Sequence, residues 1–142
     1  MQNFYHFLEQ IIPNVIKIPG ELIQASLETI FMTFVTALIA FPLGLGLGVL
    51  LVLTMPGGIK ENLRLYKWLD KIVNIFRSIP FVILIALLVG VTRLIVGRST
   101  GTLATIVPLV VSTIPFYARQ IQNTLILLDK NVIEAAQSMG LS

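Results

Sequence analysis

The stretch TIFMTFVTALIAFPLGLGLGVLLVL, residues 29–53, decides the fold class because it contains no charged side chain. It lies in a long charge-free window between Glu28 and Lys60. A helix rises about 1.5 Å per residue, so about 20 apolar residues cross the ~30 Å hydrocarbon core of a bilayer. A charged side chain at the bilayer centre costs roughly 2.5–3.5 kcal/mol. The stretch therefore predicts a transmembrane helix at about residues 23–53.

Two further windows without charge follow along the chain. The window between Arg98 and Arg119 is long enough to cross a bilayer as a helix, whereas the window between Arg77 and Arg93 is too short by itself. The shorter window crosses a bilayer only if the two flanking arginines extend their side chains to the interfaces. We predict spans at about 75–95 and 101–120, joined by a tight turn at 97–101 that makes them antiparallel neighbours. The expected fold is an all-α, polytopic membrane protein.

The composition agrees with a membrane protein. Hydrophobic residues make up 56% of the 142 residues and charged residues 12%, against about 25% charged in soluble domains. The chain has no Cys and one His, which excludes disulfide scaffolds and Cys/His metal sites. We expect no catalytic, cofactor-binding or metal-binding residue in this chain. Its net charge of +3 is dispersed, so no nucleic acid is expected as a partner.

Residues 1–21 read as an N-terminal leader on the extracytoplasmic side, ahead of a membrane domain at 22–142. The leader has apolar residues at near-helical spacing and is interrupted by Pro13, Pro19 and Gly20. An interfacial amphipathic segment and an unstructured terminus are both compatible with this pattern.

Basic residues predict the orientation in the membrane. The connection between the first two spans, at 60–77, carries five of them, and Trp68 and Tyr66 within it read as interfacial anchors. These topology anchors are Lys60, Arg64, Lys67, Lys71 and Arg77. Together with Arg119 and Lys130 in the tail at 119–142, this side has seven basic residues against three on the other side. The positive-inside rule then places the N-terminus outside and the C-terminus in the cytoplasm.

Small residues in the first window predict helix packing. Ala40, Gly44 and Gly48 are spaced at i, i+4 and i+8, so they share one helix face on which another backbone can approach closely. Pro42 predicts a kink beside them. A flexible gating hinge at this place is compatible with the same residues.

The third window contains Pro108 and Pro115. Each proline removes a backbone donor, so we predict a helix kink in preference to direct substrate contact. After Pro115, a polar face with Arg119, Gln120 and Gln122 predicts a helix that leaves the membrane. In the middle window, Ser78 and Pro80 predict a helix start.

The C-terminal segment predicts a short cytoplasmic helix at 132–139. Asn131 can cap it, with Glu134 three residues later, and Gly140 ends it. Ala135 and Ala136 leave part of its surface nearly flat. Both a helix that docks in a groove of another protein and a plain connector fit this spacing.

The sequence Glu134-Ala135-Ala136-Gln137-Ser138-Met139-Gly140 resembles the EAA motif of binding-protein-dependent ABC importer permeases. Further segments agree with that family in order, and together they resemble its methionine-importer subgroup over most of residues 20–142. These segments are Arg77-Ser78-Ile79-Pro80-Phe81, residues 93–97, residues 104–109 and residues 114–119.

The resemblance implies a permease subunit of an ATP-driven amino-acid importer, with D- or L-methionine as the expected substrate, in the bacterial inner membrane. It implies a homodimer, an ABC ATPase subunit that binds and hydrolyses ATP, and an extracytoplasmic substrate-binding protein. The permease itself would be no enzyme and would bind no ATP. Glu134, Ala135, Ala136 and Gly140 would couple it to the ATPase. In the family two further spans follow the motif, so we expect residues 22–142 to be a permease domain truncated after it.

Two other function classes differ from a permease in what they require of the chain. A small structural or regulatory membrane protein would need no ATPase partner for the 132–139 helix. An ion channel or proton-coupled carrier would call for an ionisable side chain inside a span, and the charge-free windows contain none.

Overall fold

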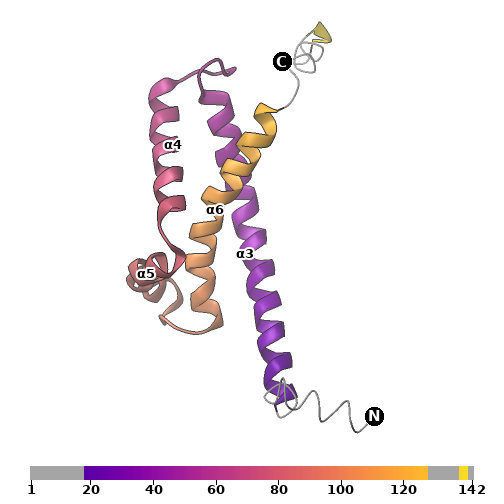
Figure 1. The fold of residues 1–142 in the computed structure, drawn as a ribbon, viewed down its shortest axis with the longest axis vertical. Coiled ribbons are helices and arrows are strands. Elements are labelled where there is room, and N and C mark those ends of the chain that lie inside the picture. The colour runs from indigo at the N-terminus through magenta and orange to yellow at the C-terminus, as the bar shows by residue number, and fades with distance from the viewer. Residues whose placement is uncertain (1–17, 128–137, 141–142) are drawn as a thin grey trace, which may run out of the picture.

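The computed structural model describes residues 18–127 and 138–140, and these residues are helical apart from short connections (Figure 1). The four long helices are α3 (Pro19–Thr54), α4 (Leu63–Ser78), α5 (Phe81–Val96) and α6 (Thr102–Ile126). The expected all-α fold class is confirmed. The leader at 1–17 and most of the predicted helix at 132–139 lie outside the described residues.

Helix α3 spans 36 residues and continues through Pro42. It begins with Pro19 in its first turn, where a missing N–H costs no hydrogen bond. The proline that was expected to interrupt the leader therefore starts the helix. After Met55 the chain turns back at Gly57, whose φ is +75°, and Asn62 N donates to Thr54 O at 3.0 Å. This turn sets the start of α4 beside the end of α3.

The span expected at 75–95 is not one continuous helix. The segment is divided between α4 and α5, which meet at an angle of 108° at residues 79–80. Pro80 disfavours helical backbone at the preceding residue, and Ile79 is extended, with φ −79° and ψ 121°. Ser78 does not cap a new helix, because it is the last residue of α4 and its Oγ donates to Asn74 O at 2.8 Å.

The basic segment at 60–77, expected as a connection, is mostly the helix α4. Asn62 caps this helix, since its Oδ1 accepts a hydrogen bond from Leu65 N at 3.2 Å. In Figure 1, α4 runs alongside α6, whereas α5 is seen nearly end-on. Because of the bend, α5 crosses α6 steeply, so the two helices are neighbours, as expected, but are not antiparallel.

The buried core lies where α3, α4 and α6 meet. Leu51, Val73 and Ala118 come from these three helices and are at most 1% exposed. Both α3 and α6 are long and apolar enough to cross a membrane, and α4 with α5 would add a third span if they are counted as one broken span. The packing thus makes α6 the central element, in contact with each of the other three helices.

Candidate functional site: the packing faces of helix α6

The first face of α6 packs on the small residues of α3. Ala40, Gly44 and Gly48 are all buried. A Cβ atom added to Gly44 would lie 2.5 Å from Tyr117 Cβ, and one added to Gly48 would lie 2.8 Å from Ala118 O. The backbones are therefore too close for any side chain at either glycine. We call this contact, between Ala40, Gly44 and Gly48 and residues 114–121, the α3–α6 seam.

Gly46 lies outside the seam. Gly46 lies between the two buried glycines in sequence, yet a Cβ added there would meet no atom within 4 Å. Phe41 borders the seam, with its ring edge-on to Tyr117 at a centroid distance of 5.7 Å. Close packing, and not a general need for flexible backbone, explains why this face of α3 is small.

The prolines occupy different environments. Pro108 and Pro115 are buried within α6, whereas Pro42 is exposed on α3. Ser112, between the two buried prolines, donates its hydroxyl to Leu109 O at 2.9 Å, three residues back. The helix thus stays continuous from Thr102 to Ile126 despite two missing backbone donors.

The second face of α6 carries a polar cluster that joins it to α4. Arg119 Nη2 donates to Asp70 Oδ1 at 2.7 Å and to Asn74 Oδ1 at 2.8 Å. Arg119 Nη1 donates to Gln122 Oε1 at 2.6 Å, and Asn74 Nδ2 donates to Asp70 Oδ2 at 3.0 Å. We call these four residues the Arg119 cluster. Each of its members bonds to at least one other, so the arginine charge is compensated where the helices meet.

The Arg119 cluster was not predicted from the sequence. Arg119 and Gln122 were expected on a polar face of a helix leaving the membrane, but Gln122 is 2% exposed and packs between helices. Asp70 lies among the basic residues of the segment at 60–77, where it forms no pattern that points to a partner. The i, i+3 spacing of Arg119 and Gln122 was a visible signal. Their partner on α4, 49 residues away from Arg119, was not.

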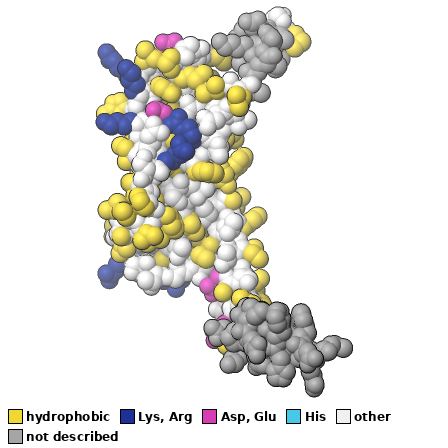
Figure 2. Space-filling view, in the orientation of Figure 1, with side chains coloured by type: hydrophobic (Ala, Val, Ile, Leu, Met, Phe, Trp, Pro, Cys, Tyr) yellow, Lys and Arg dark blue, Asp and Glu magenta, His cyan; other side chains and the backbone are white. Residues whose placement is uncertain are grey.

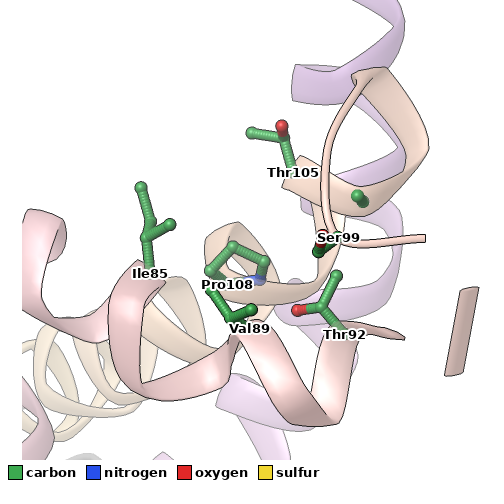
Figure 3. Close-up of a pocket in the computed structure, with 7 residues that line it drawn as sticks. Ile85, Val89, Thr92, Ser99, Thr105 and Pro108 are labelled. Atoms are coloured by element: carbon green, nitrogen blue, oxygen red, sulfur yellow. The ribbon is translucent and has the colours of Figure 1, made fainter. Parts of the chain in front are cut away.

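The third face of α6 borders a small hollow against α5 (Figure 3). Figure 3 shows Thr92 and Val89 of α5 beside Pro108 of α6, with Ser99 of the connecting turn close by. The hollow has a volume of about 40 Å³, far below the roughly 300–1,000 Å³ of ligand pockets. It is too small to hold an amino acid, and Pro108 is one of the residues that line it.

The remaining predicted site residues are the ATPase-coupling residues and the topology anchors. Glu134, Ala135 and Ala136 lie outside the described residues. Gly140 has a φ of +80°, a left-handed conformation that strains other residues. The topology anchors are all exposed: Lys60 in the turn before α4, and Arg64, Lys67, Lys71 and Arg77 on α4 itself. Among the described residues, no group of three His, Cys, Asp or Glu side chains could hold a metal ion.

The sequence of this chain is similar to those of known transport proteins. The D-methionine transport system permease protein MetI of Salmonella typhimurium is 50% identical over 119 residues, which cover 84% of this chain and 55% of that protein. MetI of Escherichia coli K12 is 48% identical over the same number of residues. The chain thus spans about half the length of the curated relatives it matches.

A solved structure, described as inward-facing conformations of the MetNI methionine ABC transporter, has the same fold. Its matched chain superposes with a TM-score of 0.82 at 47% identity, over 85% of this chain and 56% of that chain. With its apolar helices and these relatives, the protein is a multi-pass bacterial membrane protein. Residues 40–142 match the family model described as the binding-protein-dependent transport system inner membrane component, and the chain belongs to this family.

Proposed function

We propose that this chain is part of the permease subunit of an ATP-driven methionine importer. The observation that carries the proposal is the match to a chain of a methionine ABC transporter, with a TM-score of 0.82 and 47% identity. The relatives named as D-methionine permeases, at 48–50% identity, support the same substrate.

The proposed partners follow from the same relatives. An ABC ATPase subunit would hydrolyse ATP, a second copy of this protein would complete the transmembrane path, and an extracytoplasmic binding protein would deliver the substrate. The permease would perform no chemical step. Its contribution would be to convert movement of the ATPase into movement of its helices.

Helix α6 is the element that we expect to transmit this movement. Helix α6 ends at Ile126, shortly before the proposed ATPase-coupling segment at 134–140. It contacts α3 through the α3–α6 seam and α4 through the Arg119 cluster. A displacement at the C-terminal end of α6 would therefore carry α3 and α4 with it, because close-packed interfaces shift between discrete arrangements and do not deform continuously.

The proposed orientation places the α3–α4 turn and the end of α6 in the cytoplasm. These two lie at the same end of the molecule in Figure 1, while the start of α3 lies at the opposite end. The exposed Lys60, Arg64, Lys67 and Lys71 support this orientation.

A chimera tests the proposal. The 119 matching residues replace their counterparts in the Salmonella permease, in a bacterium that lacks its own methionine importer. We expect uptake of radiolabelled D-methionine that depends on the ATPase subunit. A chimera that reaches the membrane and binds the ATPase but takes up no methionine would contradict the substrate. Failure to co-purify with the ATPase would favour a structural or regulatory protein.

The coupling segment can be tested in the same chimera. Gly140→Pro forces a negative φ where the chain has +80°, because the proline ring fixes that angle. Ala135→Arg places a long charged side chain on the proposed docking surface. We expect either change to abolish uptake while ATP hydrolysis by the assembled complex continues. Uptake at the parental level in both variants would remove this segment from the coupling mechanism.

A further inference from the structure

The acidic residues near the start of α4 are used within the protein. Asp70 pairs with Arg119 at 2.7 Å, and Glu61 Oε2 accepts a hydrogen bond from Gly57 N at 2.9 Å. Among the residues that the structure describes, no acid lies within salt-bridge distance of Arg64, Lys67 or Lys71. This end of the molecule therefore presents positive charge that the described part of the chain does not neutralise.

These basic side chains lie on one stripe of α4. Arg64, Lys67 and Lys71 are spaced at i, i+3 and i+7, which brings them to one side of the helix. Figure 2 shows Lys and Arg side chains projecting from the edge of the molecule along which α4 runs in Figure 1. Their Cα atoms span about 10 Å along the axis, or about two helical turns.

An apolar stripe runs beside the basic one. Trp68 is 70% exposed, and Leu65, Ile72 and Ile75 are 39–49% exposed. The opposite face of α4 packs on the rest of the protein through Tyr66, Leu69 and Val73. The outer surface of α4 thus combines exposed apolar side chains with unpaired cations. We call Arg64, Lys67, Trp68 and Lys71 the α4 outer face.

We propose that the α4 outer face binds the headgroups of anionic phospholipids. The basic side chains would contact lipid phosphates, while Trp68 and its apolar neighbours lie against the glycerol and upper acyl region. A row of cations beside an apolar stripe matches the layered polarity of a bilayer interface, where charged headgroups lie next to the acyl region. Charge complementarity combined with this amphipathic pattern favours a lipid surface.

The only tryptophan of the chain provides the probe, because Trp68 lies on the proposed binding face. The protein is reconstituted in bilayers of phosphatidylcholine with increasing amounts of brominated phosphatidylglycerol or brominated phosphatidylcholine. Quenching of Trp68 fluorescence reports which lipid is adjacent. We expect phosphatidylglycerol to bind about fivefold more tightly than phosphatidylcholine, the factor that corresponds to one cation near an anionic surface. The preference should fall with added salt.

Matched variants locate the effect. Lys67→Gln with Lys71→Gln removes two of the three cations and should lower the preference by at least half. Arg93→Gln with Arg98→Gln removes the same charge from the last turn of α5 and from the α5–α6 turn, and should leave the preference unchanged. Equal quenching by both lipids in the unaltered protein would overturn the proposal, as would a preference that does not change on loss of Lys67 and Lys71. Quenching by neither lipid, with Trp68 also shielded from a water-soluble quencher, would overturn it by showing that another protein covers this face.

Discussion

Helix α6 is held on two sides by opposite kinds of chemistry. Against α3 it has a seam of small residues in which Ala40 and Ala118 are 0% exposed. Against α4 it has the Arg119 cluster, in which the side chains of the ion pair remain 16% and 29% exposed. Lipid tails are as apolar as leucine, so helices in a bilayer gain little from the hydrophobic effect and rely on close contact or on polar bonds. In this protein, α6 makes close contact with α3 on one side and polar bonds with α4 on the other.

The α3–α6 seam and the Arg119 cluster differ in how well they tolerate substitutions. The seam has backbone atoms among its closest neighbours, and these cannot move aside for a new side chain. In the Arg119 cluster, the contacts are made by side chains, and those of Arg119 and Asp70 are 16% and 29% exposed, so they can rearrange. We therefore expect larger effects from substitutions in the seam than from those in the cluster.

The largest effect is expected from Gly48→Leu. Its Cβ would lie 2.8 Å from Ala118 O and 2.9 Å from Ile121 Cβ, so α3 and α6 would have to separate. We expect a loss of about 3 kcal/mol or more of unfolding free energy, measured by denaturation in detergent. Gly46→Leu is the matched control, because it has open space and should gain up to about 1 kcal/mol from helix propensity. Equal destabilisation by both variants would show that the seam does not require close contact.

A smaller effect is expected from Arg119→Leu. It leaves Asp70, Asn74 and Gln122 without their shared donor, and Gln122 is almost fully buried. We expect a loss of about 2 kcal/mol in the same assay. Arg119→Lys keeps the charge but loses the planar fork of donors, so its stability should lie between those of the parent and the leucine variant. A leucine variant as stable as the parent would mean that the cluster contributes nothing to holding α4.

The smallest effect is expected from Asp70→Asn. The amide oxygen still accepts a hydrogen bond from Arg119, but the amide NH2 that replaces Oδ2 cannot accept from Asn74 Nδ2. The charge assistance and one exposed hydrogen bond are therefore lost, at about 1 kcal/mol. Exchanging the pair as Asp70→Arg with Arg119→Asp should be more stable than Asp70→Arg alone, if the two residues interact directly. If the double variant is no more stable than Asp70→Arg alone, Asp70 does not stabilise the protein through Arg119.

The two regions also differ in how far the sequence predicted them. The spacing of Ala40, Gly44 and Gly48 is visible along one helix, because residues at i, i+4 and i+8 share a face whatever packs on it. The Arg119 cluster combines residues from two helices, and one sequence contains no signal that Asp70 faces Arg119 and not solvent. Likewise, the amphipathic helix α4 was not predicted, because the charges at 60–77 suggested a connection between spans.

The sequence by itself determined the helical class and the charge-free windows now occupied by α3 and α6, since charge is excluded from a bilayer core whatever the tertiary packing. It also determined that Gly44 and Gly48 share a face. Only the tertiary structure decided that the middle window bends by 108° at Pro80, that α4 lies along α6, and that Arg119 pairs with Asp70. The last two features depend on contacts between distant segments, which are set by the packing of the whole chain. The local effect of Pro80 on Ile79 allows a break at this place but does not set its angle.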